Sequence, residues 1–365
     1  MPTSPVAYFS KMFQAVPQLM EVQKHAGGGF VSSRKSTLDA VRKLYPQVPV
    51  SRYYSLLAKF SPGYKVLSAA QAIVTGAPGG RILSQFDAKR CMVFHGTYMF
   101  LSRDALRRMA HFDLLCAIGP RMQRTIERSR QEFDLHTVQS GYLPFDSFPI
   151  KSVEANRANL AQLGLSPERK TIVYMPWGKP YGSWEQMAEK MVRELSPEFN
   201  LILRPHPSQG LTSRRSDRAS FRRVSALCQA RHNTLLDLNS CSLSQLFSLA
   251  DLMVTDGTSP AEESLFYDVP QLFVETPLWT TDVIRQDAQR EGMHEEDLAH
   301  YLTLFECGPT YRVGQSGKLG DVVADALAAA DGLRIRRDDY FRWVFGQRGR
   351  QAGARVHQAL SEWMK

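Results

Sequence analysis

The sequence predicts an α/β protein built from doubly wound parallel sheets. Short apolar strings recur along the chain, at 73–75, 91–95, 114–118, 171–175, 200–204, 251–255 and 271–275. Strands of a parallel sheet are covered on both faces and therefore read as continuous apolar runs. Amphipathic stretches of helical length lie between them, for example 183–195, 241–250 and 318–330. This alternation predicts sheets with helices on both faces.

The length of the chain indicates two domains. It has 365 residues, of which 43% are hydrophobic, and this is more than one core normally holds. The segment 147–170 carries a proline, a charged helix and a turn before a new strand, so we place a boundary there. We expect a Rossmann-like domain at 1–150, a second at 151–335, and helices at 336–365 that pack back on the first. Within 1–84 only the presence of strands is inferred.

Composition and charge narrow the class of protein. The five cysteines form no CxxC pair, which argues against a disulfide framework or a zinc site. The first thirteen residues lack the apolar core of a signal peptide, and no apolar run reaches the roughly 18 residues that cross a bilayer. We expect a cytoplasmic protein, either free or peripheral on the inner face of the membrane. The net charge of +9 favours nucleic acid, anionic lipid or a phosphorylated substrate as partner.

The first segment that carries chemistry is His95-Gly96-Thr97, at the end of a predicted buried strand. Ligands of open α/β sheets sit beyond the carboxyl ends of strands, and Gly96 allows a sharp turn there. His95 suits a general base, because its ordinary pKa is close to neutral pH. A packed histidine that bonds a carbonyl is an equally good interpretation of this residue alone.

The second segment is Arg204-Pro205-His206-Pro207, at the end of another predicted strand. The two prolines make this loop rigid. Arg204 and His206 are then held where they can grip phosphate oxygens.

The third segment runs from Thr255-Asp256 through Gly257-Thr258-Ser259 into a predicted helix with Pro260 in its first turn. Ser259 is the expected N-cap. A helix N-terminus attracts phosphate, and a nearby acidic residue can reach a ribose hydroxyl. Two acidic residues follow, Glu262 and Glu263, of which one serves the helix dipole.

A weaker candidate is Lys179, which follows the strand 171–175 and can meet a phosphate; Trp177 beside it can stack on a base or pack. The sequence shows no DxD-like pair at a strand end and no His/Cys cluster, so we predict no metal site.

The ordered set of segments resembles the CDP-glycerol glycerophosphotransferase family of teichoic-acid and capsule synthesis. That family carries HGT, then a Gly-Tyr segment with an aspartate, then a basic residue before His-Pro, then TDYSS with an acidic residue. Here these are matched by His95–Thr97, Gly141-Tyr142 with Asp146, the Arg204 segment, and Thr255–Ser259 with Glu263. Gly349–Arg355 resembles the family's C-terminal ending. The resemblance spans roughly residues 85–360.

The resemblance implies a GT-B-like fold, two Rossmann-like domains that face a central cleft, and a donor such as CDP-glycerol or another CDP-polyol. His95 would be the general base on a hydroxyl of a lipid-linked or polysaccharide acceptor. Arg204, His206, Thr258 and Ser259 would bind the diphosphate, and Glu263 would hold the ribose. Thr255, Asp256 and Lys179 would complete the donor site. His206 would act in catalysis beside His95, and Gly96, Thr97 and Gly257 would form the loops of the cleft. No cofactor and no metal is implied.

Two alternatives stay open. The turn Gly257-Thr258-Ser259 replaces the family's Tyr-Ser-Ser, and a GT-B glycosyltransferase with a nucleotide sugar would use the same donor residues. The other alternative is a non-catalytic protein that binds an anionic surface. The C-terminal segment interleaves arginines with Tyr340, Phe341, Trp343 and Phe345, a pattern that suits nucleic acid or anionic lipid. Of these we expect an anionic membrane surface and no nucleic acid.

Overall fold

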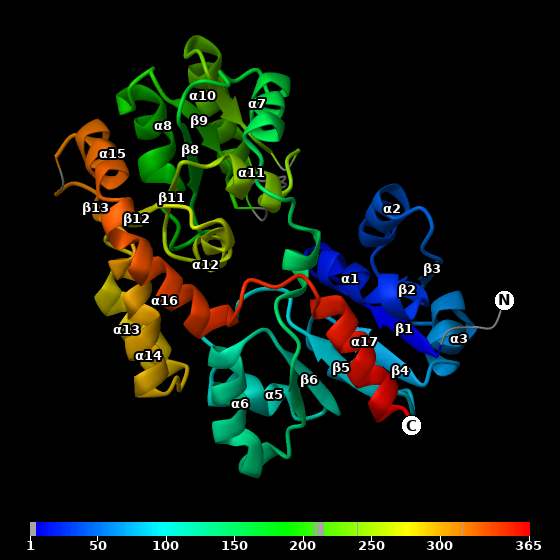
Figure 1. Ribbon diagram of the computed structural model, residues 1–365. Helices are drawn as coiled ribbons and strands as arrows, with labels where there is room; N and C mark the ends of the chain where they lie inside the picture. Colours follow the sequence, from blue (N-terminus) through cyan, green and yellow to red (C-terminus); the bar gives the residue numbers. More distant parts are fainter. Residues whose placement is uncertain (1–4, 207–208, 210–214, 239, 316) are drawn as a thin grey trace. The chain divides into compact units, whose positions relative to one another are not determined.

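The computed structural model describes residues 5–206, 209, 215–238, 240–315 and 317–365 (Figure 1). The chain divides into two compact units. Unit 1 comprises the residues up to Ser147 together with 291–294 and 342–365, and unit 2 comprises 148–290 and 295–341. Each unit contains one parallel sheet with helices, so the expected α/β class is confirmed.

The sheet of unit 1 has the strand order β3-β2-β1-β4-β5-β6-β7, and every neighbouring pair is parallel. The strands are β1 (Val6–Phe9), β2 (Gly29–Ser32), β3 (Val50–Arg52), β4 (Ala72–Thr75), β5 (Lys89–Val93), β6 (Leu114–Ala117) and β7 (Thr137–Gln139). The direction of the chain order reverses between β1 and β4. The carboxyl ends of the strands around such a switch point form the usual ligand site of open α/β sheets.

The helices of unit 1 cover both faces of this sheet. They are α1 (Val16–Ala26), α2 (Lys35–Leu44), α3 (Pro62–Ser68), α4 (Gly80–Leu83), α5 (Arg103–Met109), α6 (Pro120–Phe133) and α17 (Ala352–Trp363), with short 3₁₀ turns η1 (Phe13–Ala15), η2 (Ala58–Phe60) and η3 (Leu143–Ser147). The last of these helices, α17, belongs to the same apolar core as β1 and α1, to which it contributes Ala352, Val356 and Leu360. The C-terminal end of the chain therefore completes the core of unit 1.

Two segments that supported the family resemblance meet inside unit 1. The carboxylate of Asp146 accepts hydrogen bonds from the backbone nitrogens of Ala352 and Gly353, at 3.0 and 2.7 Å, and so caps the first turn of α17. Arg355 Nη1 reaches the carbonyl of Ser140 at 3.4 Å. We refer to these contacts between 140–146 and 352–355 as the C-terminal clasp.

The sheet of unit 2 has the order β10-β9-β8-β11-β12-β13, again with every pair parallel. The strands are β8 (Thr171–Met175), β9 (Asn200–Leu203), β10 (Thr234–Leu236), β11 (Leu252–Thr255), β12 (Gln271–Glu275) and β13 (Thr310–Arg312). Its switch point lies between β8 and β11.

Helices also flank this second sheet. They are α7 (Val153–Gln162), α8 (Trp184–Glu194), α10 (Arg215–Ala230), α11 (Leu243–Leu249), α12 (Ser259–Ser264), α13 (Thr281–Arg290), α14 (Glu295–Leu302) and α15 (Leu319–Ala328), with η4 (Leu265–Tyr267), η5 (Thr303–Glu306) and η6 (Asp331–Leu333). The helix α16 (Arg334–Phe345) spans the division, because its residues up to Phe341 group with unit 2. The expected C-terminal segment 336–365 is thus divided between the units.

All seven apolar strings predicted from the sequence form strands, and the three helical stretches form α8, α11 and α15. The sequence missed β1, β2, β3, β7, β10 and β13. Four of these are three-residue strands at the outer edges of the two sheets, and their residues are mostly only partly buried. An edge strand of that length leaves no apolar run to detect.

The interpretation of the C-terminal aromatics as a contact surface is wrong for three of the four rings, and the fourth, Trp343, is half-buried. Tyr340, Phe341 and Phe345 are all less than 5% exposed. Phe345 packs against Tyr142 and Phe145, with ring centroids 5.4 and 4.9 Å apart. These rings are core residues and are closed to lipid or nucleic acid. In the part of the chain that the structure describes, no helix is long and apolar enough to cross a bilayer.

We predict that Gly119→Ala destabilises unit 1. A Cβ at Gly119, in the β6–α6 loop, would lie 2.2 Å from the carbonyl oxygen of Val344, so the C-terminal segment would have to shift. Overpacking of this kind costs about 1–3 kcal/mol, and we expect that loss in urea unfolding. Gly332→Ala is the control, because a Cβ there meets no atom within 4 Å. Equal stability of the two variants would contradict the packing of 342–365 in unit 1.

Candidate functional site

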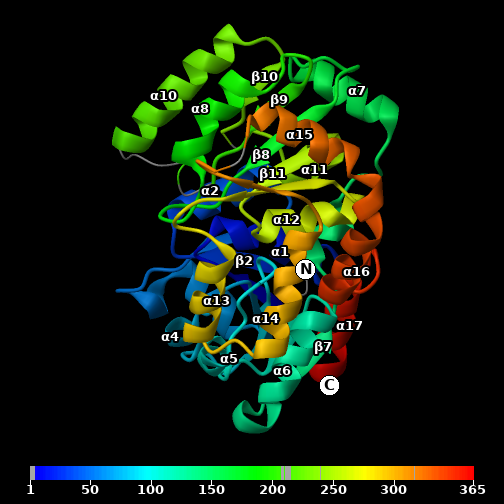
Figure 2. The ribbon, with the colours of Figure 1, turned by 90° about the vertical axis from the view of Figure 1, so that its left-hand side faces the viewer.

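The predicted site residues lie at the carboxyl edges of the two sheets. In unit 1, His95-Gly96-Thr97 follows β5, the second strand from the switch point. In unit 2, the candidate residues follow β9, β8 and β11, which are neighbours in the sheet (Figures 1 and 2).

The imidazole of His95 is oriented by the loop after β4. Its Nδ1 forms a short hydrogen bond with the carbonyl oxygen of Gly76. A carbonyl oxygen only accepts, so Nδ1 carries the proton of the neutral ring and Nε2 is the basic nitrogen. Burial lowers the pKa of His95 below its ordinary value of 6.5, and the bond to Gly76 opposes that effect. The imidazole is therefore neutral at neutral pH, as a general base requires.

Tyr98 is a second contact of this imidazole, and the sequence did not single it out as a site residue. Its hydroxyl lies 3.0 Å from His95 Nδ1, and the two rings meet edge to face with centroids 5.3 Å apart. Tyr98 has a φ of 47°, a left-handed conformation that is costly for a residue with a side chain. A strained backbone of this kind persists only where the surrounding structure holds it in place. The strained residue directly follows the His-Gly-Thr turn.

Thr97 serves the framework of this turn. It is fully buried, and its carbonyl accepts a hydrogen bond of 2.8 Å from Arg121 Nη2. The guanidinium of Arg121, itself buried, lies 5.2 Å from the ring centre of Trp343. Gly96 is half-buried between His95 and Thr97.

The carboxylate of Asp256 joins the loops that follow the two central strands of unit 2. It accepts hydrogen bonds from the backbone nitrogens of Trp177 and Ser183, at 2.7 and 2.9 Å, and from the Ser183 hydroxyl. Asp256 is only 1% exposed, and burial raises its pKa to about 6. The residue predicted to bind the donor therefore has its side chain engaged in holding the β8 loop against the β11 loop.

The turn after Asp256 is fixed by bulky side chains. Gly257 has a φ of 75°, and a Cβ there would lie 2.6 Å from the ring of Phe305, so only glycine fits. The Gly257 carbonyl accepts from the Tyr301 hydroxyl at 2.9 Å, and the Asp256 carbonyl accepts from Trp279 Nε1 at 2.8 Å. These contacts hold the backbone of the turn in one conformation.

The helix α12 begins one residue earlier than expected. Thr258 is the N-cap and makes no capping bond with its side chain, Ser259 is the first helical residue, and Pro260 is in the first turn. Thr255, at the end of β11, is buried and its hydroxyl accepts from Gly257 N at 3.4 Å. The expected N-cap role of Ser259 is thus corrected to Thr258.

The two glutamates of α12 are both buried. Glu262 is fully buried and accepts a hydrogen bond of 2.6 Å from the Tyr340 hydroxyl. Glu263 is 6% exposed.

Arg204 is committed to an ion pair within the protein. Its Nη1 contacts the Asp237 carboxylate and the carbonyl of Cys241, the latter at 3.2 Å. The side chains of Arg204 and Asp237 are 8% and 0% exposed. Removing one partner of such a pair leaves an uncompensated buried charge. The structure therefore gives Arg204 the role of tying the end of β9 to the end of β10.

Lys179 is likewise paired. Its Nζ lies 2.6 Å from an oxygen of Asp217 and 2.9 Å from one of Glu185, and its hydrogen bond to Asp217 raises its pKa. A phosphate at Lys179 would compete with two carboxylates. His206 is half-buried beyond β9, and burial lowers its pKa. Pro207 lies outside the described residues.

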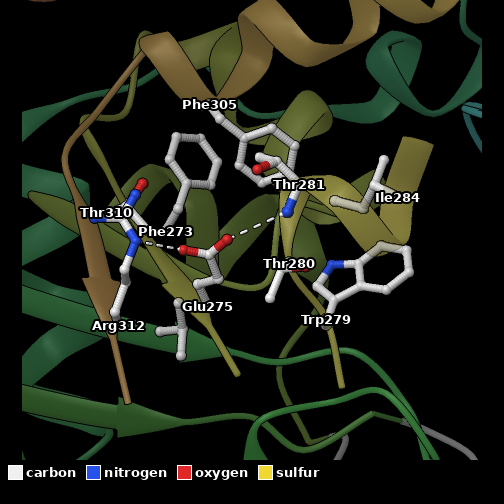
Figure 3. A pocket seen from close by; sticks show the side chains of 10 residues that line it. Phe273, Glu275, Trp279, Thr280, Thr281, Ile284, Phe305, Thr310 and Arg312 are labelled. Carbon is white, nitrogen blue, oxygen red and sulfur yellow. Dashed lines mark hydrogen bonds and ion pairs between the residues drawn. The ribbon is translucent and has the colours of Figure 1, made fainter. Parts of the chain in front are cut away.

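A small pocket opens at the carboxyl ends of β12 and β13 (Figure 3). Glu275 lies in it and accepts from Arg312 Nε at 2.7 Å and from the backbone nitrogen of Thr281 at 3.2 Å. Trp279 and Phe305 line the pocket and also contact the Asp256-Gly257 turn. The pocket and this turn are therefore one connected region.

The sequence missed the residues that brace these loops. These residues are far from their partners in the sequence. Ser183 lies 73 positions from the Asp256 carboxylate, Trp279 lies 23 positions from the Asp256 carbonyl, and Tyr301 lies 44 positions from the Gly257 carbonyl. No local pattern marks such partners. Among the residues that the structure describes, no group of three His, Cys, Asp or Glu side chains could hold a metal ion.

We predict that the stability difference between the wild type and Asp256→Asn depends on pH. The pKa of Asp256 is about 6 in the folded protein against an ordinary 3.8, so folding favours its protonated form. The contribution of this group to the free energy of unfolding is fully present below pH 3.8 and is lost as the pH rises through about 6. Across that window the advantage of the wild type should shrink by on the order of 2–3 kcal/mol.

Urea unfolding at a series of pH values measures this difference. Asp321→Asn, at an exposed carboxylate of the same unit, is the control. A difference between wild type and Asp256→Asn that stays constant across the series would contradict the buried position of this carboxylate.

Among known proteins, only solved structures were found to be similar to this chain. No protein-family model and no curated protein sequence matches the chain. The structure is similar to that of the wall teichoic acid polymerase TagF soaked with CDPG, with a TM-score of 0.66 and 15% identity over 99% of this chain and 89% of that one. It is also similar to Anabaena Alr3699/HepE in complex with UDP and glucose (TM-score 0.56, 11% identity, 98% of each chain).

A glycosyltransferase from Rickettsia africae is similar too, with a TM-score of 0.56 and 11% identity over 100% of this chain and 99% of that one. The resemblance expected from the ordered motifs thus extends to the structure of TagF. These likenesses confirm the expected fold class, two Rossmann-like α/β domains of the GT-B kind.

Proposed function

We propose that the protein transfers glycerol phosphate, or a related polyol phosphate, from a CDP-activated donor to a hydroxyl of a lipid-linked or polysaccharide acceptor. The observation that carries the proposal is the orientation of His95, whose Nδ1 is tied to the Gly76 carbonyl so that Nε2 is the basic nitrogen. The ordered motifs and the fold shared with TagF, soaked with CDPG, support the polyol-phosphate donor.

In the proposed reaction, Nε2 of His95 takes the proton of the acceptor hydroxyl. The oxygen attacks the phosphorus next to the polyol, a new P–O bond forms, and the bond to the CMP oxygen breaks. CMP leaves with the electron pair of that bond. Catalysis then depends on holding the two reactants in line and on stabilising the charge that spreads over the phosphoryl oxygens.

The donor is proposed to bind at the carboxyl edge of unit 2, against the turn from Thr255 to Thr258. The side chain of Thr258 makes no capping bond, and its hydroxyl is the proposed donor to a diphosphate oxygen. Ser259 and His206 are the other proposed phosphate ligands, and Glu263 is the proposed ribose ligand. Because Arg204 and Lys179 already balance carboxylates, their proposed role is to shape the loops around the donor.

The second candidate is a glycosyltransferase that uses a nucleotide sugar. The similarity to Anabaena Alr3699/HepE, described in complex with UDP and glucose, favours it. The acceptor oxygen would then attack the anomeric carbon, and the nucleoside diphosphate would leave. The same donor residues serve both reactions, so the donor itself has to distinguish them.

We predict that His95→Ala lowers kcat by about 10²–10⁴-fold, the usual contribution of a general base, without changing the unfolding transition. In the wild type the rate should fall as the pH drops, and this fall should lie below pH 6.5 because burial lowers the pKa of His95. His136→Ala, which removes an exposed imidazole at the amino end of β7, is the control. Normal turnover of His95→Ala would remove His95 from the mechanism.

A thermal-shift screen identifies the donor. We expect stabilisation by CDP-glycerol, CDP-ribitol and CMP that persists with EDTA; a ligand at 100 times its Kd adds about 2.7 kcal/mol. A shift with UDP-sugars and UMP alone would move the function to the glycosyltransferase. The absence of any shift with these nucleotides would contradict both and favour a non-catalytic binding protein.

A further inference from the structure

The loop between β3 and α3 exposes a dense group of apolar side chains. Leu56 is 99% exposed, Phe60 85%, Leu57 64% and Tyr54 44%. Single exposed apolar residues are common on soluble proteins. Four within seven positions, with the most exposed near the middle, form a projecting apolar surface, which marks an interaction site. We call residues 54–60 the apolar loop.

The two ends of the apolar loop are firmly held. At its start, Tyr53 is buried, its backbone nitrogen donates to the Ser32 carbonyl at 3.0 Å, and its hydroxyl donates to Gln85 at 3.2 Å. At its end, Ser61 caps α3 by accepting from the Tyr64 nitrogen at 3.2 Å and donates to the Ala58 carbonyl at 2.7 Å. The flanking elements β3 and α3 lie at the edge of the sheet of unit 1 (Figure 1). The exposed side chains therefore sit on a fixed projection.

Along the chain, the charge on either side of the apolar loop has one sign. Between Asp39 and Asp87 the sequence contains no acidic residue. The cations of this stretch are Arg42, Lys43, Arg52, Lys59, Lys65 and Arg81. Asp39 pairs with Arg42 at 3.1 Å. Lys43, Lys59 and Lys65 are exposed and form no ion pair with the part of the chain that the structure describes.

We propose that the apolar loop docks the protein on an anionic lipid bilayer. Leu56, Leu57 and Phe60 would enter the region between headgroups and acyl chains, while Lys59 and Lys65 would contact anionic headgroups. Apolar insertion combined with attraction of unpaired cations to anionic lipid is the usual basis of interfacial binding. Leu56 and Phe60 are 99% and 85% exposed, so their side chains can enter a soft bilayer without a preformed partner groove.

This proposal goes beyond the transferase function and does not depend on it. It also moves the expected membrane contact from the C-terminal aromatics, most of which are buried, to the first unit of the chain. Binding to vesicles needs neither donor nor acceptor. A failure here therefore leaves the donor screen unaffected.

Co-sedimentation with vesicles tests the apolar part of the proposal. The full chain should bind vesicles of phosphatidylcholine and phosphatidylglycerol in equal parts, and bind phosphatidylcholine alone far more weakly. Replacing Leu56, Leu57 and Phe60 together by serine should lower the partition coefficient at least about tenfold. The matched control replaces Ile150, Val153 and Ile335 by serine, three side chains of similar exposure elsewhere, and should bind like the wild type.

The electrostatic part has its own variants. Lys59→Gln with Lys65→Gln should weaken binding to the mixed vesicles, whereas Lys151→Gln with Lys318→Gln, both exposed, should not. Wild-type binding should fall as NaCl rises from about 0.1 M to about 1 M, since the Debye length shortens from about 10 to about 3 Å.

Three results would overturn the proposal. One is failure of the wild type to bind the mixed vesicles, and another is unchanged binding by the triple serine variant with a normal unfolding transition. The third is a wild type that self-associates in sedimentation velocity without lipid and becomes monomeric on the same substitutions. That result would assign the apolar loop to contacts between copies of the chain.

Discussion

The arrangement of the proposed donor side depends on one buried carboxylate. Asp256 ends the central strand β11, and its oxygens accept three hydrogen bonds from the loop that follows β8, the neighbouring central strand. A carboxylate that is 1% exposed pays a large desolvation cost unless such donors surround it. The backbone of the same turn is held by Trp279 and Tyr301, and the ring of Phe305 requires glycine at 257. The strand ends, the turn and the start of α12 therefore form one rigid piece.

In unit 1 too, a hydrogen bond joins the loops that follow two adjacent strands, but the acceptor is a carbonyl and not a carboxylate. The Gly76 oxygen, after β4, sets the tautomer of the His95 ring after β5, so that two adjacent strand ends define one basic nitrogen. The C-terminal clasp then ties α17 to the η3 turn through Asp146. In both units, motif residues predicted as ligands or matched to a family pattern hold loops in place. This is expected of sites that need preorganised geometry, since positioning the reacting groups supplies much of the rate.

The basic residues of the chain fall into two groups: those that pair with carboxylates inside a unit and those that are exposed. Arg204 and Lys179, expected to grip phosphate, each balance carboxylates of their own unit. The cations without such partners include Lys43, Lys59 and Lys65, in a stretch that has no acidic residue to offset them. A basic sequence therefore contains two populations, one that stabilises the fold and one that is open to an anionic surface. The net charge of +9 does not distinguish the two.

The sequence by itself determined the α/β class, seven of the inner strands, and the strand-end positions of His95, Arg204 and Asp256. These features are local, because a strand buried on both faces must be apolar along its length. The tertiary structure alone decided which partner each strand-end residue meets. The partner of Arg204 is Asp237, 33 positions away. The partner of His95 is Gly76, 19 positions away, and that of Asp256 is Ser183, 73 positions away. It also decided which aromatic residues are buried, since Phe345 of the basic C-terminal segment packs in the core while Phe60 projects into solvent. Hydrophobicity along the chain does not encode that choice, because burial depends on what the rest of the fold brings against each ring.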